Sequence, residues 1–430
     1  MAITGRLALV ALLGILAVAL APGWTTVLAV LAALAALVAV DVLLAGSVRG
    51  LALTRGGDTS VRLGEAAVVT LVVSNPGRRR VRGVVRDAWT PSAGASPRTQ
   101  RLDVEAGAAR RLLTTVRPTR RGDRGADRVT IRSVGPLGLA ARQGAHVVPW
   151  TVRALPPFGS RKHLPSRLAR LRDLEGRTEV MVRGQGTEFD SLREYVDGDD
   201  VRSIDWRATA RAADVMVRTW RPERDRRVVL VLDTGRTAAA RVGDAPRLDA
   251  AMDAALLLAA LATRAGDHVD FFAFDRRVRA SVRGAEGPPL MAALVESMAP
   301  LEAELVETDA RAMVTTVLQR ERQRALVVLL TALDPAPLRE GLLPVLDRLT
   351  ARHQVVVCSV ADPRLEELVE GRGDIDAVYA AASAERARRE RADLAHALAF
   401  RGVEVVDAPP ALVAPALADR YLALKAQGRL

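Results

Sequence analysis

A short apolar run that ends on an aspartate constrains the fold of this 430-residue chain more than any other feature. Residues 228–232 read VVLVL, follow two arginines and lead directly into Asp233. Continuous runs of this kind are typical of strands that are buried on both faces of a parallel sheet. Open α/β sheets bind ligands beyond the carboxyl ends of their strands, which is the position that Asp233 would occupy. The alternative is that Asp233 only caps the loop or helix that follows.

The rest of the sequence from 226 to 430 alternates between strand and helix patterns. Helical stripes separate the apolar runs, so consecutive strands are expected to be parallel and joined by right-handed crossovers. This pattern predicts a doubly wound parallel α/β sheet with an antiparallel edge ribbon. We expect strands at 228–233, 268–275, 277–282 (the ribbon), 324–333, 353–360 and 403–408, and helices near 246–265, 289–299, 309–322, 337–352, 377–401 and 411–427.

Four oxygen-bearing side chains are expected to meet at the carboxyl edge of this sheet, namely Asp233, Thr237, Thr308 and Asp334. Carboxylate and hydroxyl oxygens are the ligands that Mg²⁺ prefers, so the group fits an octahedral Mg²⁺ shell. The alternative is an N-cap at Thr308 and a turn at Asp334 before proline. Arg236 offers a positive charge that would relieve the repulsion between the two carboxylates. We therefore expect Mg²⁺ binding at this edge to be weak or absent.

Two long apolar runs occupy the amino-terminal region, residues 1–46. The first covers 7–21 and the second 24–44, with Pro-Gly between them. As a helix the second run would be about 31 Å long, which matches the hydrocarbon core of a bilayer. The runs predict a two-helix transmembrane hairpin, with Asp41 close enough to the end to reach the headgroups. A cleaved signal peptide is the alternative, because Ala-Leu-Ala at 19–21 resembles a cleavage site.

The arginines around the hairpin predict its orientation. Arg6 precedes it, Arg49, Arg55 and Arg62 follow it, and the turn between the helices carries no charge. The positive-inside rule places both ends in the cytoplasm, so we expect a two-pass protein of the cell (inner) membrane with cytoplasmic soluble domains. The single cysteine, Cys358, suits a reducing compartment.

Residues 47–155 are rich in short β-type segments separated by turn signals. Examples are AAVVTLVVSN and DRVTIRSV, and the turn signals include Asn-Pro-Gly and Arg-Gly-Asp. This composition predicts an antiparallel, immunoglobulin-like β-sandwich. The segment contains no candidate site, and we expect it to act as a spacer or docking module.

Residues 156–225 form a connector. Its segment SRLARLRDLEG, residues 166–176, predicts a short helix, and acidic, basic and aromatic residues then alternate closely from 184 to 206. The alternation fits neither a helix face nor a strand face, so an ordered loop is expected. Asp197, Asp199 and Asp200 invite a Ca²⁺ interpretation, but the glycine and closing glutamate of an EF-hand loop are missing. We favour an ion-paired network between aspartates and arginines that holds this loop against a neighbouring domain.

The carboxyl-edge pattern resembles that of the von Willebrand factor A domain. The metal-ion-dependent adhesion site of that family has the sequence D-x-S-x-S, a later threonine and a later aspartate. Asp233 matches the first aspartate, Gly235 stands at the first serine, Thr237 replaces the second, and Thr308 and Asp334 take the remaining places. The resemblance implies a von Willebrand A-like domain with a degenerate metal site.

The connector carries a second resemblance. GTEFDSLREYVDGDDVRSIDWRATAR, followed by LDTGRT, looks like the signature of domain-of-unknown-function family 58, and the layout of the whole chain is similar to that family. The resemblance implies that the protein works with a MoxR-type AAA+ ATPase and other membrane or envelope proteins. It implies an adaptor role rather than a known reaction.

These observations predict a membrane-anchored adaptor that is not an enzyme. The alternative is a metal-dependent phosphatase or hydrolase that uses Asp233, although the sequence has scattered histidines and no P-loop. The formal net charge of +12 comes almost entirely from arginine, and no basic helix with interleaved aromatics favours nucleic acid. Candidate partner-binding residues are Gly235, Arg236, Asp197, Asp199, Asp200, Asp205 and Trp206.

Overall fold

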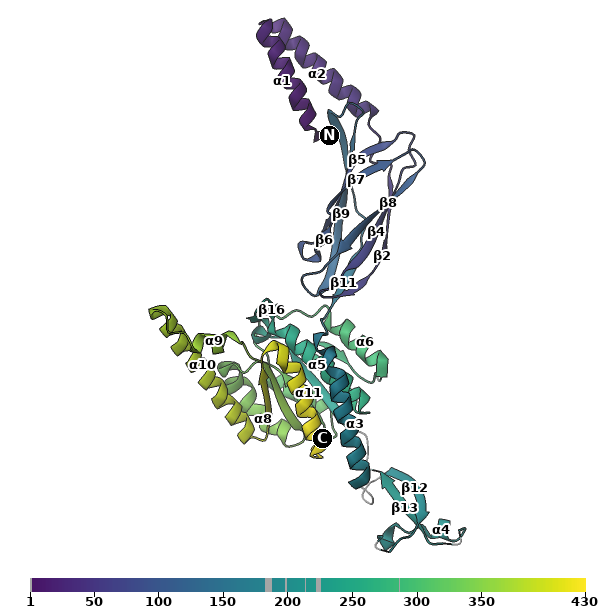
Figure 1. The fold of residues 1–430 in the computed structure, drawn as a ribbon, viewed down its shortest axis with the longest axis vertical. Coiled ribbons are helices and arrows are strands. Elements are labelled where there is room, and N and C mark those ends of the chain that lie inside the picture. Colours follow the sequence, from purple (N-terminus) through teal and green to yellow (C-terminus); the bar gives the residue numbers. More distant parts are fainter. Residues whose placement is uncertain (1, 182–187, 198, 213, 222–225, 286) are drawn as a thin grey trace. The chain divides into compact units, whose positions relative to one another are not determined.

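The computed structural model of the chain describes residues 1–430 except 1, 182–187, 198, 213, 222–225 and 286. The chain divides into two compact units, Met1–Leu155 and Pro156–Leu430 (Figure 1). The first unit combines the apolar helices with the β-rich segment. The second combines the connector with the α/β segment.

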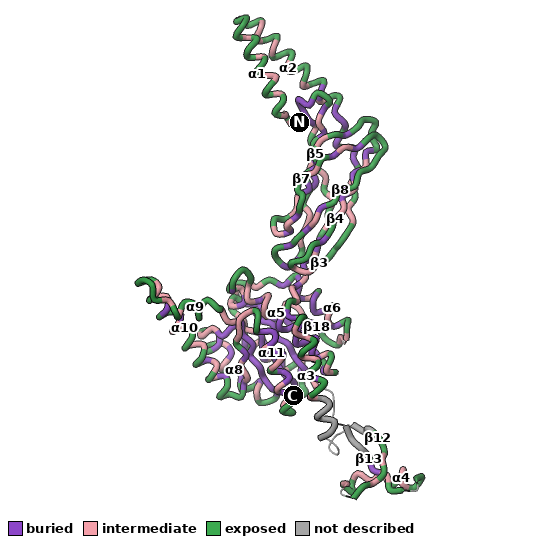
Figure 2. Tube along the Cα trace, in the orientation of Figure 1, coloured by how far each residue is buried: buried purple, intermediate pink, exposed green. Residues whose placement is uncertain are grey.

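Two apolar helices begin the first unit, α1 (Gly5–Leu20) and α2 (Trp24–Leu44). Most residues of both helices are exposed or half-buried (Figure 2), and the exposed ones include large apolar residues such as Leu9, Leu16 and Leu28. By length and composition α2 is able to cross a membrane. The 16 residues of α1 span about 24 Å, which is less than the hydrocarbon core of a typical bilayer.

The β-rich segment forms two sheets. One has β1, β10, β9, β11 and β3 in that order, with β5 paired to β9 and β7 paired to β5, and the other has the order β2-β4-β8-β6. Alternate apolar residues such as Val73, Val85 and Ile131 form the core between them. The strands are β1 (Ala2–Ile3), β2 (Ala52–Gly57), β3 (Ser60–Arg62), β4 (Ala67–Ser74), β5 (Val81–Trp89), β6 (Ala95–Ser96), β7 (Thr99–Val104), β8 (Ala109–Val116), β9 (Gly122–Val134), β10 (Ala140–His146) and β11 (Thr151–Leu155).

Arg55 lies inside this unit and does not mark the membrane side. Its guanidinium forms a two-pronged ion pair with the Asp87 carboxylate, at 2.5 and 3.0 Å, and lies over the Trp89 ring. Both charged side chains are almost completely buried. The charge asymmetry around the hairpin therefore rests on Arg6, Arg49 and Arg62.

The prediction that Asp41 reaches the headgroups is wrong. Asp41 is completely buried, and its carboxylate accepts hydrogen bonds from the backbone amides of Leu137, Leu139 and Ala140 at 2.7–2.8 Å. The end of α2 is thus attached to the turn between β9 and β10. A carboxylate near the end of an apolar helix has two ways to avoid desolvation, and here protein amides take the place of headgroups.

The amino terminus is attached to the same part of the unit. β1 pairs antiparallel with β10, and the Thr4 hydroxyl donates to the Gly138 and Leu139 carbonyls. Arg142, on β10, donates to the Val42 carbonyl near the end of α2. Both ends of the helical hairpin are therefore held by the β9–β10 region.

The second unit contains a six-stranded sheet of order β18-β17-β14-β19-β20-β21, parallel except for the edge strand β18. Its strands are β14 (Arg227–Asp233), β17 (His268–Phe274), β18 (Val278–Val282), β19 (Leu326–Leu330), β20 (Gln354–Val360) and β21 (Glu404–Ala408). The helices are α3 (Leu164–Met181), α5 (Arg247–Arg264), α6 (Gly287–Met298), α7 (Ala310–Arg320), α8 (Leu343–Thr350), α9 (Arg364–Val369), α10 (Ile375–Phe400) and α11 (Pro410–Ala426).

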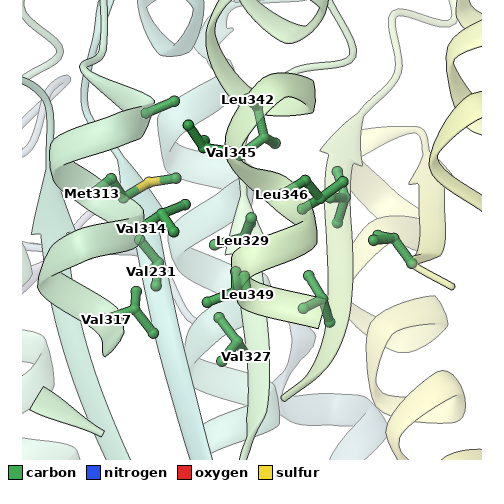
Figure 3. Close-up of a cluster of buried hydrophobic side chains, with 14 of the residues drawn as sticks. Val231, Met313, Val314, Val317, Val327, Leu329, Leu342, Val345, Leu346 and Leu349 are labelled. Atoms are coloured by element: carbon green, nitrogen blue, oxygen red, sulfur yellow. The ribbon is translucent and has the colours of Figure 1, made fainter. Parts of the chain in front are cut away.

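Helices cover both faces of this sheet. On one face α5 and α11 pack together against the strands, and α3 packs on both of them. On the other face α7, α8 and the end of α10 bury a cluster of aliphatic side chains that includes Val231, Val314, Leu329 and Leu346 (Figure 3). Burial on both faces explains why the central strands are continuous apolar runs.

The helix expected in the connector is confirmed as α3, which is longer than predicted, whereas the expected loop that follows it is instead a two-stranded antiparallel ribbon of β12 (Glu188–Glu194) and β13 (Met216–Arg221). The pattern gave no strand signal because this ribbon belongs to a separate two-stranded sheet, and a strand outside a large core does not need an alternating apolar face.

Candidate functional site

Asp233 ends β14 at the point where the strand order of the sheet reverses. β14 is paired on one side with β17, which follows it in the chain, and on the other with β19. Ligands of open α/β sheets bind at such switch points. Because Leu232 is paired with Leu330, the residues that follow them, Asp233 and Thr331, are brought together.

The Asp233 carboxylate is surrounded by hydrogen-bond donors. Oδ1 accepts from the Thr308 hydroxyl at 2.6 Å and from the Gly235 amide at 2.8 Å. Oδ2 accepts from the Thr331 hydroxyl at 2.6 Å and from the Thr237 hydroxyl at 3.4 Å. Three of the predicted edge residues therefore meet, together with Thr331, which the sequence analysis missed. The sequence did contain an indication of Thr331, because this residue directly follows the apolar run 326–330, just as Asp233 follows the run 228–232.

Gly235 has a steric role in this arrangement. A Cβ atom built on Gly235 would lie 2.1 Å from Thr308 Oγ1 and 3.0 Å from the Val306 carbonyl oxygen. The backbone of Gly235 is in an ordinary extended conformation, so space rather than φ requires the glycine. The serine that the adhesion-site pattern has at this position would displace the Thr308 hydroxyl from Asp233.

The segment from 301 to 309 covers the strand ends. The Glu304 amide donates to the Thr234 carbonyl, and the Arg236 amide donates to the Val306 carbonyl, both at 2.8 Å. Together with the hydrogen bond from Thr308 to Asp233, these bonds hold residues 301–309 across the end of β14. Asp233 consequently retains only 6% of its exposed surface.

Asp334 lies in a different environment. Its carboxylate is paired with Arg247 at the start of α5, at 3.4 Å. The expectation that Arg236 neutralises the two carboxylates is wrong, because its guanidinium is paired with Glu307. Asp334 comes three residues after Thr331, and the strand register places Thr331 beside Asp233. The positive charge that neutralises the Asp334 carboxylate is therefore the Arg247 guanidinium of α5.

A second buried carboxylate, Asp275, follows the neighbouring strand β17 and was also missed. It accepts from Arg279 at 2.7 Å, from the Arg276 amide at 2.6 Å and from the Thr234 hydroxyl at 3.3 Å. Burial acts to raise its pKa, but the bonds from Arg279 and from the backbone outweigh burial and keep the pKa below its usual value. Arg279 also pairs with Glu304 of the covering segment, at 3.0 Å.

The residues at this edge do not fit a Mg²⁺ ion. Both Asp233 oxygens already accept hydrogen bonds, Gly235 offers no side-chain oxygen, and Asp334 is bound to a guanidinium. Desolvation raises the pKa of Asp233 above its usual value, although its four hydrogen bonds oppose the shift. Among the residues that the structure describes, no three His, Cys, Asp or Glu side chains form a group that could hold a metal.

The acidic residues of the connector have structural partners. Asp199 pairs with Arg193 at 2.6 Å and accepts from the Val196 amide, and Asp200 accepts from the Arg202 amide. The bond from Arg193 lowers the pKa of Asp199. Asp197 is exposed.

Asp205 organises the turn that carries Trp206. It caps α4 (Trp206–Thr209) through the amides of Arg207 and Ala208, and it pairs with Arg218 of β13 at 2.8 Å. The bond from the Ala208 amide, followed by that from Arg218, lowers its pKa. These ion pairs join parts of the connector to each other, whereas the alternating charges had predicted ion pairs that hold it against a neighbouring domain.

Several apolar side chains in the segment between β12 and β13 are exposed. Trp206 is 70% exposed, Val201 63% and Val196 61%. At the sheet edge, Arg236 is exposed and Gly235 is buried. Of the proposed partner-binding residues, Asp197, Asp200, Trp206 and Arg236 thus lie at the surface, and Gly235 acts through packing.

Part of the chain matches a known family. Residues 191–395 match the family described as "Protein of unknown function DUF58". The match begins within β12, includes the Trp206 turn and Asp233, and ends within α10. The DUF58 match therefore covers the connector from β12 onward and every strand of the six-stranded sheet except β21.

Curated relatives cover a similar share of the chain. Uncharacterized protein Rv1480 of Mycobacterium tuberculosis is 27% identical over 195 residues, which is 44% of this chain and 59% of that protein. Uncharacterized protein Mb1516 of Mycobacterium bovis gives the same values. The chain thus spans about three fifths of the length of these relatives.

Solved structures match a smaller part. The CARDB domain of the PF1109 protein from Pyrococcus furiosus, in complex with di-metal ions, is 18% identical and covers 24% of this chain and 86% of that one, with a TM-score of 0.19. SSP-19 of Caenorhabditis elegans, an MSP-domain protein like family member, is 13% identical and covers 23% and 94%, with a TM-score of 0.18. Likeness at these scores carries no argument about function.

Proposed function

We propose that this chain is a membrane-anchored adaptor that binds partner proteins and is not an enzyme. The observation that carries the proposal is the Trp206 turn, which is capped and ion-paired yet leaves the indole 70% exposed. Preorganised aromatic side chains are frequent anchors of protein interfaces, because little conformational entropy is lost when they bind. The exposed Arg236 at the von Willebrand A-like sheet edge forms a second part of the partner surface.

The anchor in this proposal is the α1–α2 hairpin, crossing the inner membrane twice. Support comes from its two ends, since β1 and Asp41 are both attached to the β9–β10 region. A chain whose two ends meet the same folded unit must return to the side from which it started. With Arg6 and Arg49 flanking the hairpin, the positive-inside rule favours a cytoplasmic location for both units.

The partner class in this proposal is a MoxR-type AAA+ ATPase, with other membrane or envelope proteins. The sequence signature around the Trp206 turn supports this choice through the resemblance that it carries. The degenerate adhesion site does not need Mg²⁺ for this role.

The arrangement at Asp233 favours an adaptor over a phosphatase or hydrolase. A carboxylate that acts as nucleophile or base needs an oxygen that faces the substrate. Both Asp233 oxygens face internal donors, and the 301–309 segment covers them.

Co-purification tests the proposed function. The tagged full chain is isolated from membranes of the cell that produces it, and the MoxR-type ATPase that accompanies it is quantified. We expect Trp206→Ala to lower the recovered ATPase at least about tenfold, since an interface anchor contributes about 2 kcal/mol or more. Phe400→Ala, which removes an aromatic side chain that is 93% exposed on α10, is the matched control. Equal recovery with wild type and Trp206→Ala would reject the Trp206 turn as the partner site.

Reporter fusions test the location separately. An enzyme that is active only in the periplasm is fused to the carboxyl terminus, and a matched fusion is made in the charge-free turn at 21–24. We expect activity only from the turn fusion. Activity from the carboxyl-terminal fusion would reject the cytoplasmic placement.

A further inference from the structure

The helical corner formed by α9 and the start of α10 lies at the same sheet edge as Asp233. α9 follows the carboxyl end of β20, which is parallel to β19 and β14. Between 364 and 380, a range that the structure describes without a gap, no residue is buried. The first buried side chain of α10 is Ala381. This corner therefore extends beyond the core that holds the rest of α10.

An apolar stripe runs along the exposed side of this corner. Ile375 is 75% exposed, Val378 51% and Tyr379 72%, and Leu368 on α9 is 44% exposed. The first three occupy positions i, i+3 and i+4, so they share one face of the helix. A single exposed apolar residue is ordinary, whereas a stripe with helical spacing indicates a contact with another helix. We name these four residues the α9–α10 stripe.

The charge around the stripe is opposite to that of the whole chain. The residues from 362 to 376 carry a formal net charge of −4, whereas the chain as a whole carries +12. One of the two arginines in this range, Arg372, donates to the carbonyls of Val369 and Gly371 and so faces its own backbone. The acidic residues are Asp362, Glu366, Glu367, Glu370, Asp374 and Asp376.

We propose that the α9–α10 stripe binds an amphipathic helix of another protein, one with an apolar face flanked by Lys and Arg. The helical spacing of the stripe supplies the ridge against which such a helix packs, and the acidic rim supplies the complementary charge. The proposal rests on the adaptor function, and it adds a second docking surface with a stated partner chemistry. Tyr379 is the central contact, because it is aromatic and highly exposed.

Photo-crosslinking of the full chain tests this docking surface. Benzoylphenylalanine replaces Tyr379, membranes of the producing cell are irradiated, and the crosslinked peptide is sequenced by mass spectrometry. The matched control has the same group at Phe400, which is 93% exposed at the opposite end of α10. We expect an adduct only from position 379, on a peptide of another protein that is basic and has helical apolar spacing.

Charge reversal supplies the second readout. Glu367→Lys with Glu370→Lys should lower the crosslink yield at least about fivefold, which corresponds to about 1 kcal/mol of binding free energy. The same number of reversals at Glu65 and Glu105, in the other unit, should leave the yield unchanged. Raising the salt concentration should also lower the yield, because exposed charges are screened.

The proposal would be overturned if no adduct forms at position 379, or if the adduct is to a second copy of this chain or to a peptide without Lys or Arg. It would also be overturned if the charge reversals leave the crosslink yield at position 379 unchanged. The test is separable from that of the adaptor function. A crosslink at 379 that survives Trp206→Ala, while ATPase recovery is unaffected by that substitution, would reject the Trp206 turn and retain the α9–α10 stripe.

Discussion

The Thr308 hydroxyl reaches Asp233 Oδ1 at 2.6 Å through space that exists only because residue 235 is glycine. The two residues are 75 positions apart, and their bond holds the covering segment on the end of β14. The same contact satisfies an oxygen that a metal shell would need, which is why we expect Mg²⁺ to bind weakly at this edge. The carboxyl edge is consequently a fixed, hydrogen-bonded surface.

The interdependence of Gly235 and Thr308 is measurable. Gly235→Ala should lower the free energy of unfolding by about 1–3 kcal/mol, as overpacking substitutions do, because its Cβ must displace Thr308 Oγ1. Thr308→Ala should cost about 1.5–3 kcal/mol, because it removes a bond to a carboxylate. The double variant should cost less than the sum of the two, since both lose the same bond. Chemical denaturation of the wild type, the two single variants and the double variant measures these free energies of unfolding. If the two losses simply add in the double variant, Gly235 and Thr308 do not act on the same hydrogen bond.

Mg²⁺ should bind weakly at this edge. In calorimetric titrations of the full chain in detergent, we expect no site tighter than about 100 μM, equivalent to about 5.5 kcal/mol. Gly235→Ser, which completes the adhesion-site pattern, should not create one, because the serine clashes with Thr308. Asp233→Ala is the control. Tight binding by the wild type that disappears in Asp233→Ala would restore a metal site.

Asp275 should make stability depend on pH. Its pKa is lowered in the folded state, because hydrogen bonds from Arg279 and the backbone outweigh burial, which by itself would raise it. Such a group stabilises above its unfolded pKa of about 3.9, and this stabilisation is lost as the pH falls through the folded value. The wild type should therefore be more stable than Asp275→Asn at neutral pH, with a difference that narrows below about pH 4. Chemical denaturation of both proteins between neutral pH and about pH 3 measures this difference in the free energy of unfolding. A difference that stays the same at every pH would contradict the prediction.

Asp41 should hold the α1–α2 hairpin to the turn between β9 and β10. Asp41→Ala removes three hydrogen bonds from backbone amides to a buried carboxylate and leaves those amides unsatisfied, which should cost about 3 kcal/mol or more. Asp123→Ala is the matched control, because its ion pair with Arg153 is exposed and should contribute at most about 1 kcal/mol. Hydrogen exchange at 137–140 is the local readout. Equal protection of these amides in wild type and Asp41→Ala would show that the carboxylate does not hold the turn.

Local pattern accounts for most elements of the six-stranded sheet and its helices. The six expected strands coincide with those observed, and the expected helices coincide with α5, α6, α7, α10, α11 and a π-helical turn that continues into α8, whereas the short helix α9 was not predicted. The length of an apolar run and the spacing of its apolar residues depend on which faces of the strand or helix are buried, and both can be read from a short stretch of sequence. The β12–β13 ribbon was not accessible in this way, because its stability comes from pairing, caps and ion pairs such as Arg218 with Asp205.

The sequence by itself determined which side chains stand at the ends of strands, because a buried strand must stop where its apolar run stops. It placed Asp233, Thr308 and Thr237 in one group, as they are in the structure. Only the tertiary structure decided their partners. Strand register brings Thr331 rather than Asp334 to Asp233, and the β9–β10 turn brings three amides to Asp41. These contacts join residues nearly a hundred positions apart, and a side chain carries no local signal of which distant donor will satisfy it.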